Sequence, residues 1–293
     1  MNSFLPIICV ALSGITFGTI GYFGTVLLEA GYSESDMLFW RFILSTLFIT
    51  PFLKMPKHSK MPFKALGFCF VLGCTFYSFG TYCLFSAIPH VGSGIAMVIF
   101  YLFPLLVAIL NWLIDKRKLT LIEIGALLLI LPGIMLLSIT DDTDFNVFGI
   151  LLGLGSALFY GTYFYSSQKI GQKIPSQWAS FMVCLGNAAS FAMICFSQQS
   201  LQIPETMIVC LQYIGFAFIG TVLPLWLLFY GLKKVNVTKA ALVSVLEPIS
   251  TVLIGVLLLD ETLSVHQIAG IIIMLCAALL VQFNVKKPVI TAH

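Results

Sequence analysis

Long apolar runs, separated by short polar breaks, follow one another along nearly the whole of this 293-residue chain. Most of the runs match the roughly 20 apolar residues that a helix needs to cross a lipid bilayer. Only 9% of the residues are charged, compared with about 25% in soluble domains. The sequence therefore predicts an all-α integral membrane protein with ten transmembrane helices, over about residues 4–28, 36–53, 63–87, 91–114, 121–139, 147–167, 177–197, 206–232, 239–259 and 264–284.

The Lys and Arg residues support this count because they gather in alternate breaks. All of them except Arg41 fall in the C-terminal tail or in four breaks, at 54–64, 115–120, 168–176 and 233–239. Most of the other breaks carry acidic residues instead. Because positively charged loops stay on the cytoplasmic side, we predict a multi-pass protein of the cell (inner) membrane with both termini cytoplasmic.

Arg41 is the one basic residue within a predicted span, near the outer end of the second. Long basic side chains at such positions commonly extend along apolar surface until their charge reaches the interface. We interpret Arg41 in this way. The alternative is a part in the transport path, because charges inside a membrane are candidates for function.

The second half of the chain resembles the first at a nearly constant offset. Phe85 aligns with Phe229, and Pro104 aligns with Pro248. Each half holds five predicted spans, and an odd number gives the halves opposite orientations, as in many secondary transporters. We therefore predict two inverted five-helix repeats around a central cavity, at residues 1–141 and 146–285, followed by a cytoplasmic tail at 286–293.

Pro104 and Pro248 occupy matched positions within the fourth and ninth spans. A proline removes one backbone hydrogen bond of a helix, so Pro248 should free the carbonyl of Ser244 and Pro104 that of Phe100. A membrane tolerates such breaks where protein or a water-filled cavity satisfies the freed group. We predict that the two prolines form matched hinges beside the substrate site. The alternative is a plain structural kink at each.

Glu247 is the only acidic residue deep inside a predicted span. A charged side chain at the bilayer centre costs about 2.5–3.5 kcal/mol on insertion scales, so this carboxyl needs a partner, water or a proton. We predict either a proton-coupling site or a counter-charge for an amine on the substrate. The alternative is a neutral carboxylic acid that is hydrogen-bonded between helices.

Three segments carry a family resemblance: GTVLPLW at 220–226, AALVSVLEPI at 240–249 and LDETLS at 259–264. They are similar to the second repeat of EamA-type members of the drug/metabolite transporter superfamily. The first half resembles the family more loosely, through Phe17-Gly18, Arg41-Phe42, Pro104 and the run at 125–133. The resemblance covers nearly the whole chain and implies ten helices around a central cavity for small metabolites.

The resemblance implies that the third, fourth, eighth and ninth helices line the cavity, with help from the first and sixth. On this plan the cavity is aromatic, and Tyr82 and Trp226, which are repeat mates, face it together. The predicted substrate-binding residues are Tyr77, Tyr82, Met97, Tyr101, Tyr160, Tyr163, Trp226, Tyr230, Ser244 and Glu247. The alternative for the aromatic residues is helix packing or an interfacial belt.

These features predict a secondary active transporter that moves a small metabolite by alternating access. An aromatic cavity with one carboxylate favours an amino acid or another amphipathic, drug-like solute with an amine. The bacterial relatives imply efflux, and protons are the candidate coupling ion. Two alternatives stay open: an uncoupled facilitator or channel for small solutes, and an intramembrane lipid-modifying enzyme.

Motifs for other functions are missing from the sequence. It holds no H-E-x-x-H, no G-x-S-x-G and no Gly-rich phosphate loop, and its eight cysteines form no C-x-x-C pair. We therefore predict no catalytic residue, no cofactor, no metal site and no nucleic-acid partner. The expected partners are the lipid bilayer, a small-molecule substrate and at most a second copy, as a monomer or weak homodimer.

Overall fold

The computed structural model describes residues 4–53, 62–137, 146–171, 173–198, 201–244, 246–258 and 264–283. Within these ranges every regular element is a helix, as the sequence predicts. In chain order the elements are α1 (Phe4–Phe17), α2 (Thr19–Glu29), α3 (Glu34–Ile49), η1 (Thr50–Phe52), α4 (Phe63–Leu72), η2 (Gly73–Tyr77), α5 (Ser78–Phe100), α6 (Phe103–Asp115), α7 (Leu121–Leu137), α8 (Val147–Gly171), α9 (Ser176–Gln198), α10 (Met207–Ala217), η3 (Phe218–Val222), α11 (Leu223–Leu232), α12 (Val237–Val243), α13 (Leu246–Leu258) and α14 (Val265–Phe283).

Several helical segments are long enough to cross a membrane, and the exterior of the bundle is apolar. Both features confirm a multi-pass membrane protein. Phe63, Leu128 and Phe196 are among many large apolar side chains on the surface, whereas Arg41 and Asn187 are buried. Such a surface suits lipid rather than water. The helical segments that are long and apolar enough to cross a membrane are Leu5–Glu29, Phe63–Ala87, Val147–Ile170, Ser176–Gln198, Met207–Leu232 and Val237–Leu258, with shorter apolar helices at Phe103–Asp115 and Leu121–Gly133.

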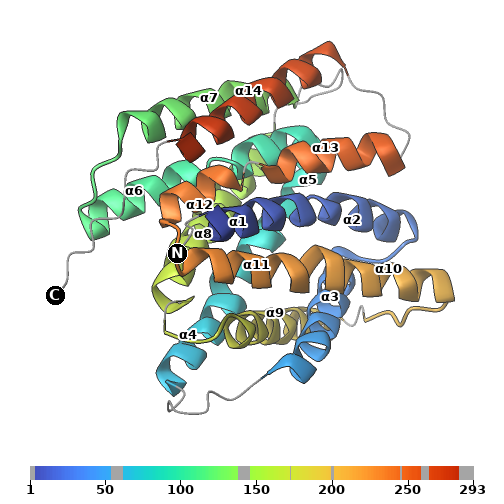
Figure 1. Ribbon diagram of the computed structural model, residues 1–293. Helices are drawn as coiled ribbons and strands as arrows, with labels where there is room; N and C mark the ends of the chain where they lie inside the picture. The colour runs from blue at the N-terminus through green and yellow to red at the C-terminus, as the bar shows by residue number, and fades with distance from the viewer. Residues whose placement is uncertain are drawn as a thin grey trace.

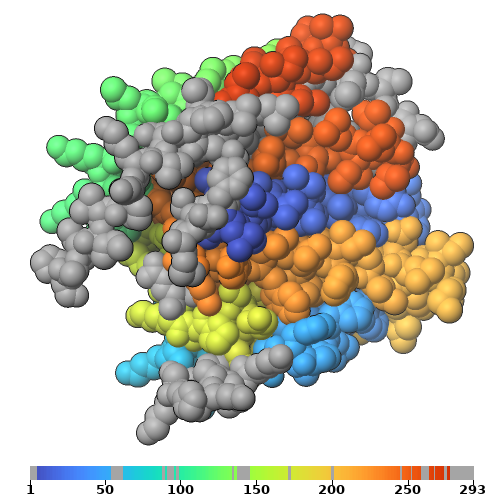
Figure 2. Space-filling model, in the orientation of Figure 1, coloured from blue at the N-terminus to red at the C-terminus, as the bar shows by residue number. Residues whose placement is uncertain are grey.

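The helices pack in pairs that recur between the two halves of the chain. The α1–α2 segment lies along α10–α11, and α8 lies along α4 and α5. Two further pairs join the halves directly, α3 with α9 and α7 with α14. Figure 1 shows that α1 begins and α14 ends at the same end of the bundle. Figure 2 shows α1 and α2 between α13 and α10–α11 on one face of the molecule.

Helices are interrupted at the same relative place in each half. α5 ends at Phe100 and α6 begins at Phe103, just before Pro104. In the second half α12 ends at Val243, and α13 begins shortly before Pro248. The interruptions that the prolines predict are therefore present, because a proline lacks the N–H that would continue the preceding helix.

One predicted break is wrong. The sequence places a loop at 88–90, between the third and fourth spans, but the backbone stays helical throughout α5. A helix satisfies its own backbone groups, whereas a loop in an apolar environment would leave several of them without partners. The predicted tail at 286–293 lies outside the described residues.

Two π-helical turns, η2 and η3, also occupy matched places in the two halves. A π-turn accommodates an extra residue, and such turns often occur at functional sites. In each turn a hydroxyl closes on the carbonyl five residues back. Ser78 Oγ donates to Gly73 O at 2.8 Å, and Thr221 Oγ1 donates to Phe216 O at 3.1 Å.

Glycines bring α1 and α2 close to the interruption between α12 and α13. A Cβ atom on Gly14 would lie 3.4 Å from the backbone nitrogen of Glu247. Gly18, which separates α1 from α2, is packed more tightly, against Ser250 and Thr251. Small residues at a helix contact allow this approach of the two backbones.

Gly18→Ala should destabilise the fold. The added Cβ would lie 2.5 Å from the Ser250 Cβ and 2.9 Å from the Thr251 backbone nitrogen, and relieving such overpacking costs about 1–3 kcal/mol. The matched control is Gly67→Ala in α4, where a Cβ meets nothing within 4 Å. Thermal unfolding in detergent should show a lower midpoint for Gly18→Ala only. Equal midpoints would mean that α1 and α13 are not held this closely.

Candidate functional site

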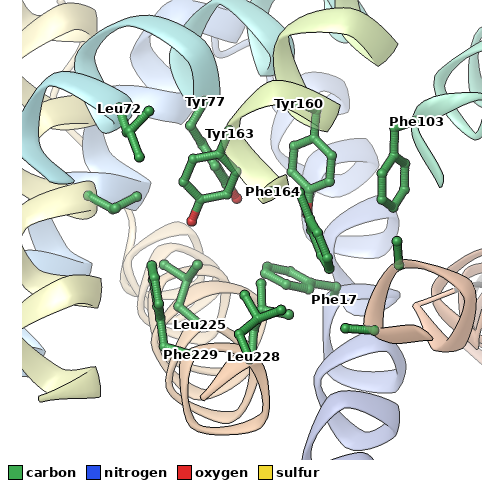
Figure 3. Close-up of a cluster of buried hydrophobic side chains, with 14 of the residues drawn as sticks. Phe17, Leu72, Tyr77, Phe103, Tyr160, Tyr163, Phe164, Leu225, Leu228 and Phe229 are labelled. Atoms are coloured by element: carbon green, nitrogen blue, oxygen red, sulfur yellow. The ribbon is translucent and has the colours of Figure 1, made fainter. Parts of the chain in front are cut away.

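A cluster of buried tyrosines lies inside the bundle where η2 meets α8. The rings of Tyr77 and Tyr163 pack edge to face with centroids 4.7 Å apart. Tyr160 lies 5.8 Å from each of them. Figure 3 shows the three rings side by side, with the hydroxyls of Tyr77 and Tyr163 on the side that faces Leu225 of α11. The structure thus brings together three of the predicted binding residues.

The interruption before Pro104 adds aromatic residues to this cluster. Phe100 and Phe103 pack against Tyr160, with ring centroids 5.0 and 4.9 Å away. Tyr101, which lies in the turn between them, is 1% exposed, and its hydroxyl has no hydrogen-bond partner. The helix interruption therefore directs the side chain of Tyr101, a fourth predicted binding residue, into the interior.

Glu247 lies at the start of α13 and faces the tyrosine cluster. Its side chain is half-buried, and Tyr101, Tyr160 and Tyr77 all interact with its charge. The Tyr101 hydroxyl lies next to the carboxyl without meeting the geometry of a hydrogen bond. A carboxylate bordered by aromatic faces and phenol hydroxyls is suited to a cation, which each of these groups attracts.

The Ser244 carbonyl is not free, contrary to the sequence prediction. The backbone N–H of Glu247 donates to it at 2.9 Å. This bond spans three residues, as in a tight helix end, and replaces the bond that Pro248 cannot make. The Ser244 hydroxyl is also occupied, because it donates to Ala240 O at 3.0 Å. Both polar groups of Ser244 therefore have partners within the helix ends beside Glu247.

Arg41 is buried, so the interpretation that it reaches the membrane interface is wrong. The side chain is 1% exposed. Its Nε donates to Thr221 Oγ1 at 2.7 Å, and its Nη2 donates to Gly220 O at 3.3 Å. The guanidinium also lies over the rings of Phe42 and Phe216, 4.9 and 4.6 Å from their centroids.

The contacts of Arg41 have an uncharged counterpart in the other half. Ser78, which closes η2, donates to Asn187 Oδ1 of α9 at 2.8 Å, as Thr221, which closes η3, accepts from Arg41 of α3. Each π-turn is thus held by one polar side chain of the helix beside it. Arg41 and Glu247 interact electrostatically across the interior, but they form no ion pair within the described residues.

Sequence reasoning missed Arg41, Asn187 and Thr221 as parts of the site's frame. The signal for Arg41 was its place inside a span, where a charge is functional by default. No comparable signal marked Asn187, because an amide on an apolar helix is unremarkable until its partner on another helix is known.

Four predicted binding residues are not shown to join the cluster. Trp226 packs edge to face on Phe52, 5.1 Å away, and Tyr230 is 38% exposed near Lys234. Tyr82 is half-buried on α5 and packs against the apolar core. The side chain of Met97 lies outside the described residues. Among the described residues no group of three or more His, Cys, Asp or Glu side chains could hold a metal ion.

Known proteins resemble this chain along most of its length. It is 26% identical over 264 residues to an uncharacterised transporter of Archaeoglobus fulgidus, which covers 89% of this chain and 90% of that protein. It is 24% identical over 245 residues to an uncharacterised transporter of Synechocystis, across 80% and 71% of the two chains. A solved crystal structure that is 15% identical superposes with a TM-score of 0.79 over 95% of this chain and 96% of that one. The last likeness shows the fold alone.

The model of the EamA-like transporter family matches residues 4–139 and 147–283. Both halves of the chain match this model, and the two matches together leave out only the termini and a short segment in the middle. The chain therefore belongs to the EamA-like transporter family.

Proposed function

We propose that this protein is a secondary active transporter that carries a small amine-containing metabolite out of the cell. The substrate is an amino acid or another amphipathic, drug-like solute. One observation carries the proposal: Glu247 stands at a helix interruption and faces a buried cluster of tyrosines. An ammonium group would gain an ion pair with the carboxylate and cation–π attraction from the rings.

The substrate site of this proposal includes Tyr77, Tyr101, Tyr160, Tyr163 and Glu247. The aromatic side of the cluster suits the apolar part of an amphipathic solute, since phenol rings offer contact area as well as a polar tip. The Tyr101 and Tyr163 hydroxyls are buried without hydrogen-bond partners. A bound solute or water would supply these missing partners.

We infer an architecture of two inverted repeats, in the first of which the continuous helix α5 joins the third and fourth predicted spans. The matched helix interruptions, the matched π-turns and the recurring helix pairs all support it. The two repeats would occupy residues 1–141 and 146–285, with Pro104 and Pro248 as equivalent hinges. In transporters of this kind the substrate site lies between the repeats near the middle of the membrane, where Glu247 would be.

Polar contacts join the two halves of the chain at both ends of the bundle. Near the end of α6, Asn111 Nδ2 donates to Thr238 Oγ1 of α12 at 2.8 Å. At the same end, Lys169 Nζ of α8 lies 2.9 Å from Asp115 Oδ1. At the opposite end, Ser35 Oγ of α3 donates to Gln198 Oε1 of α9 at 3.1 Å, and Trp40 Nε1 of α3 donates to Gln202 O at 2.8 Å.

Orientation in the membrane follows from the basic residues. The end that carries Asp115 and Lys169 also carries most of the Lys and Arg residues, so we place it in the cytoplasm. Both termini would then be cytoplasmic, in the cell (inner) membrane. An exporter in this orientation would receive its proton, and release its substrate, on the outer side.

The test is transport by purified protein in proteoliposomes. A radiolabelled mixture of L-amino acids should enter vesicles preloaded with the unlabelled mixture, and this exchange should saturate. Flux that never saturates and ignores the solute inside would favour the channel. Enzymatic modification of lipid headgroups in the same vesicles would favour the enzyme. Absence of exchange, with binding in a thermal-shift screen of other metabolites, would exclude amino acids as the substrate class.

A further inference from the structure

A continuous set of aromatic contacts crosses the interior from η2 to the interruption before Pro104. Tyr77 contacts Tyr160, Tyr160 contacts Phe103, and Phe103 contacts Tyr101, with ring centroids 5.8, 4.9 and 5.9 Å apart. Figure 3 shows Tyr160 between Tyr77 and Phe103. The hydroxyl groups at the two ends of this set therefore belong to Tyr77 and Tyr101.

Charges of opposite sign lie at these two ends. The Tyr77 hydroxyl lies beside the guanidinium of Arg41, and the Tyr101 hydroxyl lies beside the carboxyl of Glu247. Tyr160, in the middle, interacts with both charges. The tyrosine cluster is thus bordered by a cation on one side and by an acid on the other.

Backbone contacts place the same two groups on either side of the α1–α2 junction. The carbonyl of Gly220 accepts a hydrogen bond from Arg41, and a Cβ on this glycine would lie 3.5 Å from Thr19 Oγ1. A Cβ on the preceding junction residue, Gly18, would lie 3.0 Å from the carbonyl oxygen of Glu247. Adjacent residues of one segment therefore touch both the π-turn that holds Arg41 and the helix end that carries Glu247.

The hydrogen bonds of Arg41 fix the orientation of its planar group. Nε donates to Thr221 Oγ1 and Nη2 donates to the Gly220 carbonyl, so η3 occupies the edge of the guanidinium that these two nitrogens form. The N–H groups of Nη1 and the second N–H of Nη2 point away from that edge. A guanidinium edge of this kind matches a carboxylate, which it binds through two parallel hydrogen bonds.

Arg41 and Glu247 do not neutralise one another directly. Their charges interact, but the ion pairs among the described residues are Arg117–Glu123 and Lys169–Asp115. A buried charge is costly unless an opposite charge compensates it. A molecule that carries both an ammonium and a carboxylate would compensate both residues at once.

We propose that Arg41 binds the carboxylate of the substrate while Glu247 binds its amine, so that the site selects zwitterionic α-amino acids over simple amines. This inference rests on the proposed function, because it takes Glu247 as the group that receives the amine. The substrate's side chain would lie against the tyrosine rings, which suit an apolar group. An amine without a carboxylate would leave the charge of Arg41 uncompensated, and sites discriminate strongly against a ligand that lacks such a partner.

Competition in proteoliposomes tests this selectivity in the wild-type protein. Exchange of a radiolabelled L-amino acid mixture is measured at about pH 6, where an α-amino group is protonated. The competitors are the unlabelled mixture and a mixture of the corresponding amino acid amides, which keep the amine and the side chain. The amides should compete about tenfold to a hundredfold more weakly, as expected when a hydrogen bond to a charged group is lost. Equal competition would overturn the proposal.

Variants of Arg41 test whether this residue is the source of the preference. Arg41→Gln should bring the amino acids and the amides to within about twofold of each other, because it removes the positive charge. Arg41→Lys should show a reduced preference, since it keeps the charge but lacks the planar edge. Each preference is a ratio within one variant, so a smaller folded fraction does not alter it. If Arg41→Gln does not fold, a preference of wild-type size in Arg41→Lys overturns the proposal.

Asn187→Ala is the matched control. Asn187 accepts from Ser78 and holds η2 without a charge, as Arg41 holds η3. The control should unfold at a lower temperature than the wild type and keep the full preference for amino acids. Loss of the preference in this variant as well would mean that packing at the π-turns sets it, and the role of Arg41 would be wrong.

Failure of this proposal can be told apart from failure of the proposed function. If the amides exchange as well as the amino acids do, the role of Arg41 is wrong and the amine transporter stands. If neither mixture exchanges, both proposals are wrong. If carboxylic acids that lack the amine compete as strongly as the amino acids, Glu247 does not bind an amine, and both proposals are again wrong.

Discussion

Glu247→Gln should abolish uptake driven by a pH gradient while exchange of substrate across the membrane continues. Gln keeps the size and hydrogen-bonding capacity of the side chain but cannot take up or release a proton. If Glu247 binds a proton and the substrate's amine in turn, loss of its carboxyl uncouples substrate movement from proton movement. Pure exchange needs no net proton movement, so it should survive at reduced affinity. Proteoliposomes that are loaded at one pH and diluted into another measure both rates.

The matched control is Glu123→Gln. Glu123 is also buried, at 1% exposed, but it is paired with Arg117 at 3.2 Å and accepts a bond from the Thr120 backbone N–H. Its substitution should lower stability and leave the pH dependence of uptake unchanged. Unaltered pH-driven uptake in Glu247→Gln would show that the Glu-Pro pair is a structural kink.

Arg41→Leu should cost about 3 kcal/mol of unfolding free energy, because hydrogen bonds to charged groups contribute about 1.5–3 kcal/mol each. The substitution removes the donors to Thr221 and to the Gly220 carbonyl, and this carbonyl would then lie in an apolar interior. Arg41→Lys should be intermediate, since an ammonium keeps the charge but lacks the planar fork of donors. Thermal or denaturant unfolding in detergent measures both variants.

Arg117→Leu is the control for the loss of a guanidinium. The Arg117 side chain is 34% exposed in its ion pair with Glu123, and exposed pairs of this kind contribute about 0–1 kcal/mol. Arg41→Leu should therefore unfold well before Arg117→Leu. If the two variants unfold together, the bonds of Arg41 to η3 do not stabilise the fold.

The membrane class and the helix interruptions could be predicted from sequence because their causes are local. Apolar runs of sufficient length have few alternatives to a spanning helix, and Pro104 and Pro248 each lack the backbone N–H that would continue the preceding helix. Tyr77, Tyr101, Tyr160 and Tyr163 were expected at the site from the family's helix plan, and the structure does bring them together. Whether they bind substrate stays a prediction.

The inward-facing side of α11 could not be predicted in the same way. Trp226 and Tyr230 are four residues apart and share a helix face, but η3 adds a residue to the turn that precedes them. The extra residue rotates the following helix, so that Leu225, Leu228 and Phe229 are buried instead. Nothing local in the sequence marks this turn.

The burial of Arg41 also could not be predicted from the sequence. Its burial depends on Thr221 and Gly220, which lie on a different helix in the other half of the chain. A single sequence shows a charge near the end of an apolar run, where reaching the interface is the usual outcome. The π-turn that accepts the guanidinium becomes visible only once the helices are packed.

The central claim is that a proton and the substrate's amine share Glu247, and calorimetry tests it most directly. Binding of an amine substrate to the purified protein, titrated in buffers with different ionisation enthalpies, measures the protons released on binding. The account predicts release of about one proton per substrate bound by the wild type, and none by Glu247→Gln. Binding without proton release in the wild type, or equal release in both proteins, would contradict it.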